Sequence, residues 1–303
     1  KRTAVELLKE VSEKGKSLAQ YKLGCIYADS DNAKIYNIEN AIKYLKMSAD
    51  QENEYAQYKL GVIYLNPELK EKQDIDQAIK YLEASATQGN QYAQYKLGVI
   101  YLKPELPDAY DTSKAIKYLE ASAEQGNQYA QYKLGTIYLN PQLPDSYDMS
   151  KAIKYLEASA EQENQFAQYR LGALYSNLEL PGIYNINKAI KYLAMSATQG
   201  NQYAQCKLGC IYYFGKGVEC NQELGKYWLG RAAEQGNQFA KDVLEGQVLG
   251  LGFSYCLVKG ALSAMENMNR QAAEQYNQLS KTNSKQAMKE KYMHNKEKEQ
   301  DIW

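Results

Sequence analysis

The chain has 303 residues with 36 basic and 36 acidic side chains, so its net charge is zero. This balance gives the chain no overall attraction for nucleic acid or for an anionic membrane surface. The single histidine, His294, lies near the C-terminus. A nucleophilic serine or cysteine elsewhere would therefore lack a histidine base, which argues against a hydrolase.

The cysteines and the apolar segments bear on the compartment. The five cysteines form an odd set without regular spacing, which fits a reducing compartment better than a disulfide framework. The longest apolar region, residues 248–262, contains Ser254 and Lys259 and is too short to cross a bilayer. Residues 1–3 lead directly into an amphipathic run, with no signal peptide. We therefore expect a cytoplasmic protein that does not enter the membrane.

A period of 37 residues dominates the sequence. The ten residues YAQYKLGVIY occur at 55–64 and again at 92–101. The period is marked by a Leu-Gly pair at Leu23-Gly24, Leu60-Gly61, Leu97-Gly98, Leu134-Gly135, Leu171-Gly172 and Leu208-Gly209. Such a period is typical of helical arrays, in which each copy packs against a copy of the same neighbour.

The N-terminal segment is part of this pattern. Residues 3–24 align with residues 114–135, so the chain opens on the second half of a repeat. We therefore expect the sequence to be the C-terminal piece of a longer polypeptide. The apolar face formed by Ala4, Leu8 and Val11 would then lie uncovered.

Each repeat predicts two amphipathic helices, which we call helix A and helix B. In the copy at 90–126, the apolar stripe of helix A is Ala93, Leu97, Ile100 and Tyr101, and that of helix B is Ala115, Tyr118, Leu119 and Ser122. An Asn or Asp precedes each helix B, and an Asn usually precedes helix A. These residues are expected to cap the helices by accepting backbone N–H groups.

Glycine has two different roles in the repeat. Helix B mostly ends at a glycine, as a left-handed position requires. In two copies Glu52 and Glu163 replace it, at a cost of about 1 kcal/mol in a left-handed conformation, so we expect those corners to be wound differently. The glycine of each Leu-Gly pair lies inside helix A, where it costs roughly 0.5–1 kcal/mol relative to alanine. Because this cost is accepted in all six repeats, we predict that a neighbouring helix occupies the space that a Cβ at the glycine would need.

The C-terminal part departs from the repeat. Residues 239–240 begin a seventh helix A, and apolar residues between 251 and 279 then alternate in steps of four and three, which predicts a long helix. This helix either caps the last repeat or makes a coiled-coil contact with another chain or an upstream domain. The predicted organisation is the second helix of a truncated repeat at 1–18, six repeats at 19–238, a partial repeat with the capping helix at 239–280, and a polar, lysine-rich, disordered tail at 281–303.

The repeat pattern A-x-x-x-L-G-x-x-Y, then a loop, then K-A-x-x-W-Y-x-x-A-A-E-x-G-N, resembles the Sel-1-like repeat, a relative of the tetratricopeptide repeat. The copy at 204–237 is the most similar, with Gly215 to Val218 as the family's G-x-G-V loop and Trp228 at its aromatic position. The other five copies have a loop that is one residue longer and a tyrosine instead of the tryptophan. The resemblance covers about residues 1–246. It implies an all-α, right-handed α-solenoid of stacked helix pairs.

The function that this resemblance implies is a non-enzymatic scaffold, an adaptor that binds a protein or peptide segment along the concave face of a superhelix. It carries over no catalytic residue and no cofactor. The alternative is a regulatory or targeting tail of a larger enzyme, because repeats followed by a lysine-rich end look like the tails of some bacterial mobilisation relaxases.

By the same resemblance, helix A would present two rows of side chains to the groove. The tyrosine row is Tyr58, Tyr95, Tyr132 and Tyr169, with Tyr92 and Tyr129 beside it, and the basic row is Lys22, Lys59, Lys96, Lys133, Arg170 and Lys207. Tyrosine rings offer apolar contact with a polar tip, and the cations would favour a ligand with acidic groups. Alternatively, the aromatic residues pack one repeat on the next and the cations form a solvated flank.

Cysteines provide a weak candidate for a metal site. Cys206 and Cys210 share one helix face and Cys220 follows in the next loop, but a fourth ligand is absent. Cys206 stands where the preceding repeat has Tyr169. We therefore expect a substitution within the core and no metal.

Overall fold

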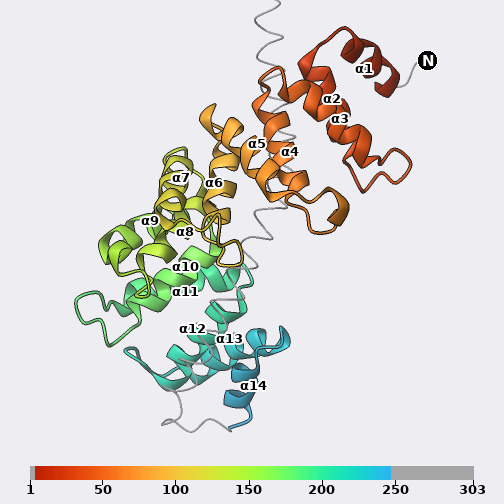
Figure 1. Cartoon of the computed structure of the whole chain (residues 1–303). Helices are drawn as coiled ribbons and strands as arrows, with labels where there is room; N and C mark the ends of the chain where they lie inside the picture. Colours follow the sequence, from red (N-terminus) through yellow and green to blue (C-terminus); the bar gives the residue numbers. More distant parts are fainter. Residues whose placement is uncertain (1–3, 247–303) are drawn as a thin grey trace, which may run out of the picture. The chain divides into compact units, whose positions relative to one another are not determined.

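The computed structural model describes residues 4–246, and this part of the chain is all-α, with no β-strand (Figure 1). Its helices are α1 (Ala4–Glu13), α2 (Ser17–Tyr27), α3 (Ile38–Ala49), α4 (Glu54–Tyr64), α5 (Ile75–Thr87), α6 (Gln91–Ile100), α7 (Thr112–Glu124), α8 (Gln128–Tyr138), α9 (Met149–Glu161), α10 (Gln165–Tyr175), α11 (Ile186–Thr198), α12 (Gln202–Phe214), α13 (Gln222–Glu234) and α14 (Gln238–Leu244). Two short 3-10 helices, η1 (Lys70–Lys72) and η2 (Pro144–Ser146), lie in loops. The predicted helix at 251–279 and the tail at 281–303 lie outside the described residues.

The chain divides into two compact units, with the boundary between Asn127 and Gln128. In the first unit α2, α4 and α6 are helices A, each followed by its helix B, and α1 is a helix B that precedes them. In the second unit α8, α10 and α12 are helices A with their helices B, and α14 follows. Within each unit, helix A packs on the helix B of its own repeat and on the helix B of the preceding one. The predicted fold of stacked helix pairs is confirmed. None of the described helices is long and apolar enough to span a membrane.

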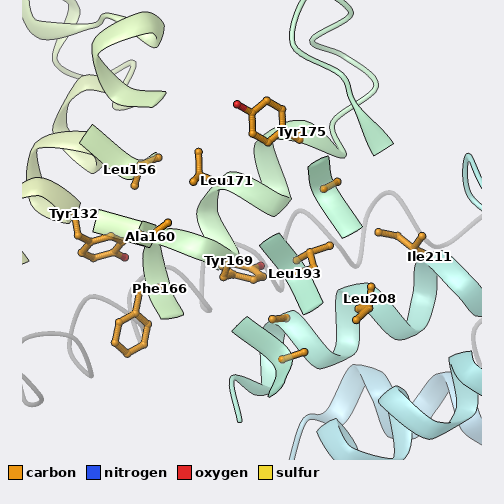
Figure 2. Packing of buried hydrophobic residues seen from close by; sticks show 14 residues of the cluster. Tyr132, Leu156, Ala160, Phe166, Tyr169, Leu171, Tyr175, Leu193, Leu208 and Ile211 are labelled. Carbon is orange, nitrogen blue, oxygen red and sulfur yellow. The ribbon is translucent and has the colours of Figure 1, made fainter. Parts of the chain in front are cut away.

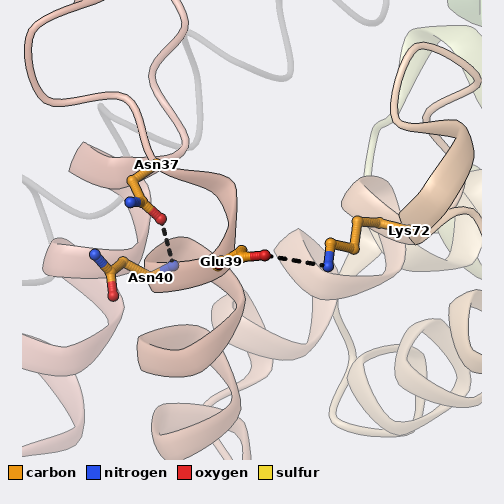
Figure 3. A network of polar contacts seen from close by, with 4 residues as sticks. All are labelled: Asn37, Glu39, Asn40 and Lys72. Atoms are coloured by element: carbon orange, nitrogen blue, oxygen red, sulfur yellow. Dashed lines mark hydrogen bonds and ion pairs between the residues drawn. The ribbon is translucent and has the colours of Figure 1, made fainter.

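The predicted N-caps are present. The side chain of Asn37 accepts the backbone N–H of Asn40 at 2.9 Å (Figure 3). The other helix B caps that make this bond are Asp74, Asp111, Asp148, Asn185 and Asn221, and the helix A caps are Asn53, Asn90, Asn164, Asn201 and Asn237. Figure 3 also shows an exposed ion pair between Glu39 and Lys72, at 3.5 Å, which joins two repeats but contributes little to stability.

The glycine inside helix A marks a close approach, as predicted. A Cβ added to Gly98 would lie 2.5 Å from Leu119 Cγ and 3.1 Å from the carbonyl oxygen of Ala115. The same arrangement recurs at Gly24, Gly61, Gly135, Gly172 and Gly209. The neighbour in each case is helix B of the same repeat, so the glycine allows the two helices of a pair to touch.

The turns after α3 and α9, in which Glu52 and Glu163 replace the usual glycine, differ from expectation. Glu52 and Glu163 have φ values of 60° and 63°, in the same left-handed region as the corner glycines such as Gly89, at 90°. The prediction that these corners are wound differently is therefore wrong. Packing of the adjacent helices fixes the conformation of the corner, and the glutamates adopt it at an energetic cost.

A row of buried glutamines, which the sequence analysis did not single out, links each helix A to two helices B. Gln168 donates to the carbonyl of Ala160 in the preceding helix B at 3.1 Å and accepts from Gln199 of its own repeat at 2.8 Å. Gln94 makes the corresponding bonds to Ala86 and Gln125. Gln168 is fully buried and Gln94 nearly so. The signal available in the sequence was the glutamine after the first alanine of helix A in all six copies.

We predict that Gly98→Ala destabilises the first unit by about 1–2 kcal/mol. The added methyl group would overpack against Leu119, which costs about 1–3 kcal/mol, while better helical propensity returns up to about 1 kcal/mol. The matched control is Gly230→Ala in α13, where an added Cβ would meet open space. This substitution should raise the stability of the chain. Urea unfolding measures both changes, and an equal gain in the two variants would contradict the close approach.

We also predict that Glu52→Gly and Glu163→Gly each stabilise the chain by about 1 kcal/mol, because glycine adopts positive φ without steric strain. Glu161→Gly, within helix α9 two residues before Glu163, should be destabilising instead. The free energy of unfolding in urea checks this. Loss of stability at both corners would mean that the glutamate side chains contribute more than the backbone strain costs.

Candidate functional site

The tyrosine row lies inside the stack. The exposed fractions of Tyr58, Tyr95, Tyr132 and Tyr169 are 3%, 2%, 0% and 8%. In the second unit the ring of Tyr132 lies 6.1 Å from that of Phe166 on the next helix A (Figure 2). In the first unit the Tyr58 and Tyr92 rings are also 6.1 Å apart. These four tyrosines are therefore buried, which favours the alternative that they pack one repeat on the next over a role as the ligand surface.

The reason for this burial is the number of neighbours that helix A has. It contacts its own helix B, the preceding helix B, and, at α2–α4 and α10–α12, the adjacent helix A. The two residues beside the tyrosine row are also mainly interior: Tyr129 is buried and Tyr92 is half-buried. What remains accessible on helix A is a narrow stripe.

The basic row lies on this stripe. Lys59, Lys96, Lys133 and Lys207 are half-buried, and Arg170 is 9% exposed. The residue three positions later on the same helix face is small or medium-sized in each case: Val62, Val99, Thr136, Ala173 and Cys210. We call the part of this surface formed by Lys133, Thr136, Arg170, Ala173 and Lys207 the helix A stripe of the second unit.

Burial disfavours the charged form of the lysines in this row. It lowers the pKa of Lys133 to about 8, and the nearby Arg170 guanidinium adds to the shift. It lowers the pKa of Lys96 to about 8 as well, with Lys103 as the adjacent cation, and it also lowers the pKa of Lys207. Within the described part of the chain, Lys133, Arg170 and Lys207 have no ion pair with a carboxylate. The positive charge of these three residues is therefore not neutralised by any carboxylate of residues 4–246.

Arg170 is the most enclosed member of the row. Burial raises the pKa of the Tyr132 hydroxyl, on the preceding helix A, and the nearby Arg170 guanidinium opposes this rise. Its Nε is buried and has no hydrogen-bond partner. An unsatisfied buried donor costs about 1–3 kcal/mol, so this nitrogen is available to an acceptor that the stripe does not itself provide.

A second set of lysines, which the sequence analysis missed, is arranged differently. Lys188 lies over the ring of Tyr175 with its Nζ 4.9 Å from the ring centroid, and that ring stacks on Tyr192 with an interplanar angle of 9°. The Tyr175 hydroxyl donates to Glu157 at 3.0 Å. In the first unit Lys114, Tyr101, Tyr118 and Glu83 form the same group. These charges are satisfied within the protein, so the group is structural.

Two of the three candidate cysteines are buried and the third is exposed. Cys206 and Cys210 are buried together, and the hydrogen bond between them and their burial raise the pKa of Cys206. Cys220 is exposed, and its Sγ is hydrogen-bonded to the carbonyl of Tyr213 at 3.2 Å. Among residues 4–246, no group of three or more His, Cys, Asp or Glu residues could hold a metal ion.

Repeated helix pairs with a regularly spaced stripe of side chains define the class of helical-repeat scaffold proteins. The Sel1 repeat model matches the chain six times, at residues 17–53, 54–90, 91–127, 128–164, 165–201 and 202–237. The chain belongs to the Sel1 repeat family.

Two solved structures are similar to this chain. The first is c5321, a protective antigen of uropathogenic Escherichia coli strains that displays an SLR fold, with 28% identity and a TM-score of 0.70 over 90% of this chain. This chain spans 57% of the length of that protein. The second is a Sel1 repeat protein from Oxalobacter formigenes, with 23% identity and a TM-score of 0.55, covering 72% of this chain and 85% of that one. No curated protein matches the chain in sequence.

The lowered pKa of Lys133 predicts a pH dependence of stability. The folded state binds the Lys133 proton more weakly than the unfolded state, where the pKa is near its ordinary value of 10.5. Folding is therefore opposed below pH 8, and the opposition is relieved as the pH rises from about 8 towards 10. Lys133→Met should raise the urea midpoint at pH 7, and the difference from the unmodified chain should shrink as the pH rises.

The control for this prediction is Lys154→Met, on the exposed face of α9, which should change the midpoint little at any pH. The measurement stays below pH 10 because tyrosines ionise above it in the unfolded chain. A Lys133→Met variant that is less stable at pH 7, or a gain that does not depend on pH, would contradict the desolvated charge.

Proposed function

We propose that this chain is a non-enzymatic scaffold that binds a segment of another protein along the helix A stripe. The observation that carries the proposal is the basic row: its cations in the second unit are half-buried or buried and are not neutralised by a described carboxylate. Unneutralised charge lowers the stability of a fold, so a row of it favours a binding role over a structural one. By contrast, Lys114 and Lys188 of helices B lie over tyrosine rings, and their charges are satisfied within the protein.

The repeat supports this proposal through its spacing. Equivalent positions on consecutive helices A offer the same kind of contact once per repeat, which suits an extended or helical segment that makes many similar contacts. Ala173 and Thr136 are small enough to let the backbone of such a segment approach. The buried tyrosines keep the helices A in contact with one another without themselves reaching the ligand.

The alternative expected from the sequence, a regulatory or targeting tail of a DNA-mobilising relaxase, gains no support from the family match or from the two solved structures. Membership of the Sel1 repeat family supports the scaffold function without naming a partner.

Selection from a phage-displayed library of random peptides tests the proposal. We expect the complete chain to enrich related peptides, and we expect Ala173→Trp to abolish their binding in calorimetry because the indole would fill the stripe on α10. Met195→Trp, at an exposed position on α11, is the control and should bind as the unmodified chain does. Both variants should keep the thermal midpoint of the parent within a few degrees.

Two results would contradict the proposal. The first is the absence of any enriched peptide family. The second is a set of enriched peptides that bind Ala173→Trp as tightly as they bind the parent chain, because this would place the binding surface away from helix A.

A further inference from the structure

We propose that the segment bound by the second unit is acidic, and that one of its carboxylates binds at Arg170 with Lys133 and Lys207 on either side. This inference rests on the function proposed above and specifies the chemistry of its ligand. It depends on the contacts of Arg170, on the identity of its neighbours and on the groups that are missing from its surroundings.

Arg170 differs from the equivalent residue of every other repeat. The other five members of the basic row are lysines, and this position alone has a guanidinium. It is also the most buried member, at 9% exposure. A buried guanidinium usually pairs with a carboxylate, yet no carboxylate within residues 4–246 forms an ion pair with Arg170. Its Nε–H has no acceptor among these residues either.

A carboxylate suits this buried donor better than a neutral acceptor does. The guanidinium presents its N–H donors in a planar fork, and two parallel N–H groups match the two oxygens of a carboxylate. The burial of Arg170, at 9% exposure, limits the movement of this fork, which reduces the entropy lost on binding. Lys133 and Lys207 occupy the equivalent position on the preceding and following helices A and add two half-buried amines.

Nucleic acid is the competing polyanion, and the structure favours it less. Single-stranded nucleic acid needs aromatic faces on which bases stack, but Tyr132 and Tyr169 beside the stripe are buried and pack on Phe166 and Tyr203 of the next helix A. The basic row provides one cation per repeat, and the chain as a whole has no net charge. Phosphate backbones are bound through many simultaneous contacts with lysine and arginine, which this row does not supply.

Fluorescence anisotropy with the complete chain tests this inference. The probes are a fluorescein-labelled glutamate-rich peptide, the same peptide with glutamine at each glutamate, and labelled oligothymidylate. We expect the glutamate peptide to bind about tenfold more tightly than the glutamine peptide, with an affinity that falls as salt is added. Arg170→Gln should remove about tenfold of that affinity, and Arg170→Lys should recover part of it.

Two further variants keep the test valid if Arg170→Gln folds poorly. Lys207→Gln removes a half-buried charge of the same row and should also weaken the glutamate peptide, whereas Lys154→Gln on α9 removes an exposed charge and should not. Equal binding of the glutamate and glutamine peptides would overturn the acidic ligand while leaving the scaffold proposal intact. Tighter binding of oligothymidylate than of either peptide would overturn both, and so would a selection that yields no peptide.

Discussion

The contact between the glycine of helix A and the leucine of helix B determines how each repeat is built. At Gly98 the leucine of the partner helix occupies the space that any larger residue would need, so the two helices touch along their backbones. Because the same contact recurs at one spacing, equivalent residues of successive helices A face the same way within each unit. Within the second unit, the alignment of Lys133, Arg170 and Lys207 is a consequence of this packing.

Polar groups then fix how one repeat meets the next. A buried glutamine of helix A bonds to the helices B on both sides. Gln168, for example, donates to the carbonyl of Ala160 near the end of α9 and accepts from the side-chain amide of Gln199, which follows α11. A buried serine of helix B joins the two helices of a single repeat, as when Ser196 donates to the carbonyl of Gln165 at 2.7 Å. Buried amides must find partners, so these bonds exclude shifted arrangements of the helices. The fold can therefore tolerate the charges of Lys133, Arg170 and Lys207, which no carboxylate of residues 4–246 neutralises.

Local and periodic features of the fold could be predicted from the sequence. The caps, the period and the close approach at Gly98 each depend on residues that are near in sequence or recur at a fixed interval. The burial of Tyr132 could not be predicted, because periodicity shows which residues share a helix face but not what covers that face. The cover is Phe166, on the following helix A. The prediction for Glu163 failed for a related reason: the packing of the adjacent helices imposes a left-handed conformation that glutamate disfavours. Of the candidate site, the basic row remains a prediction and the tyrosine row belongs to the core.

The central claim is that the charged stripe of helix A, and no surface of helix B, receives the ligand. Lysine-directed chemical labelling with mass spectrometry tests this most directly, because the chain has lysines on both kinds of helix. With the glutamate-rich peptide added in excess, the account predicts slower labelling of Lys133 and Lys207 and unchanged labelling of Lys154 and Lys191, which are exposed on helices B. Protection of Lys154 and Lys191, with Lys133 and Lys207 unaffected, would contradict it.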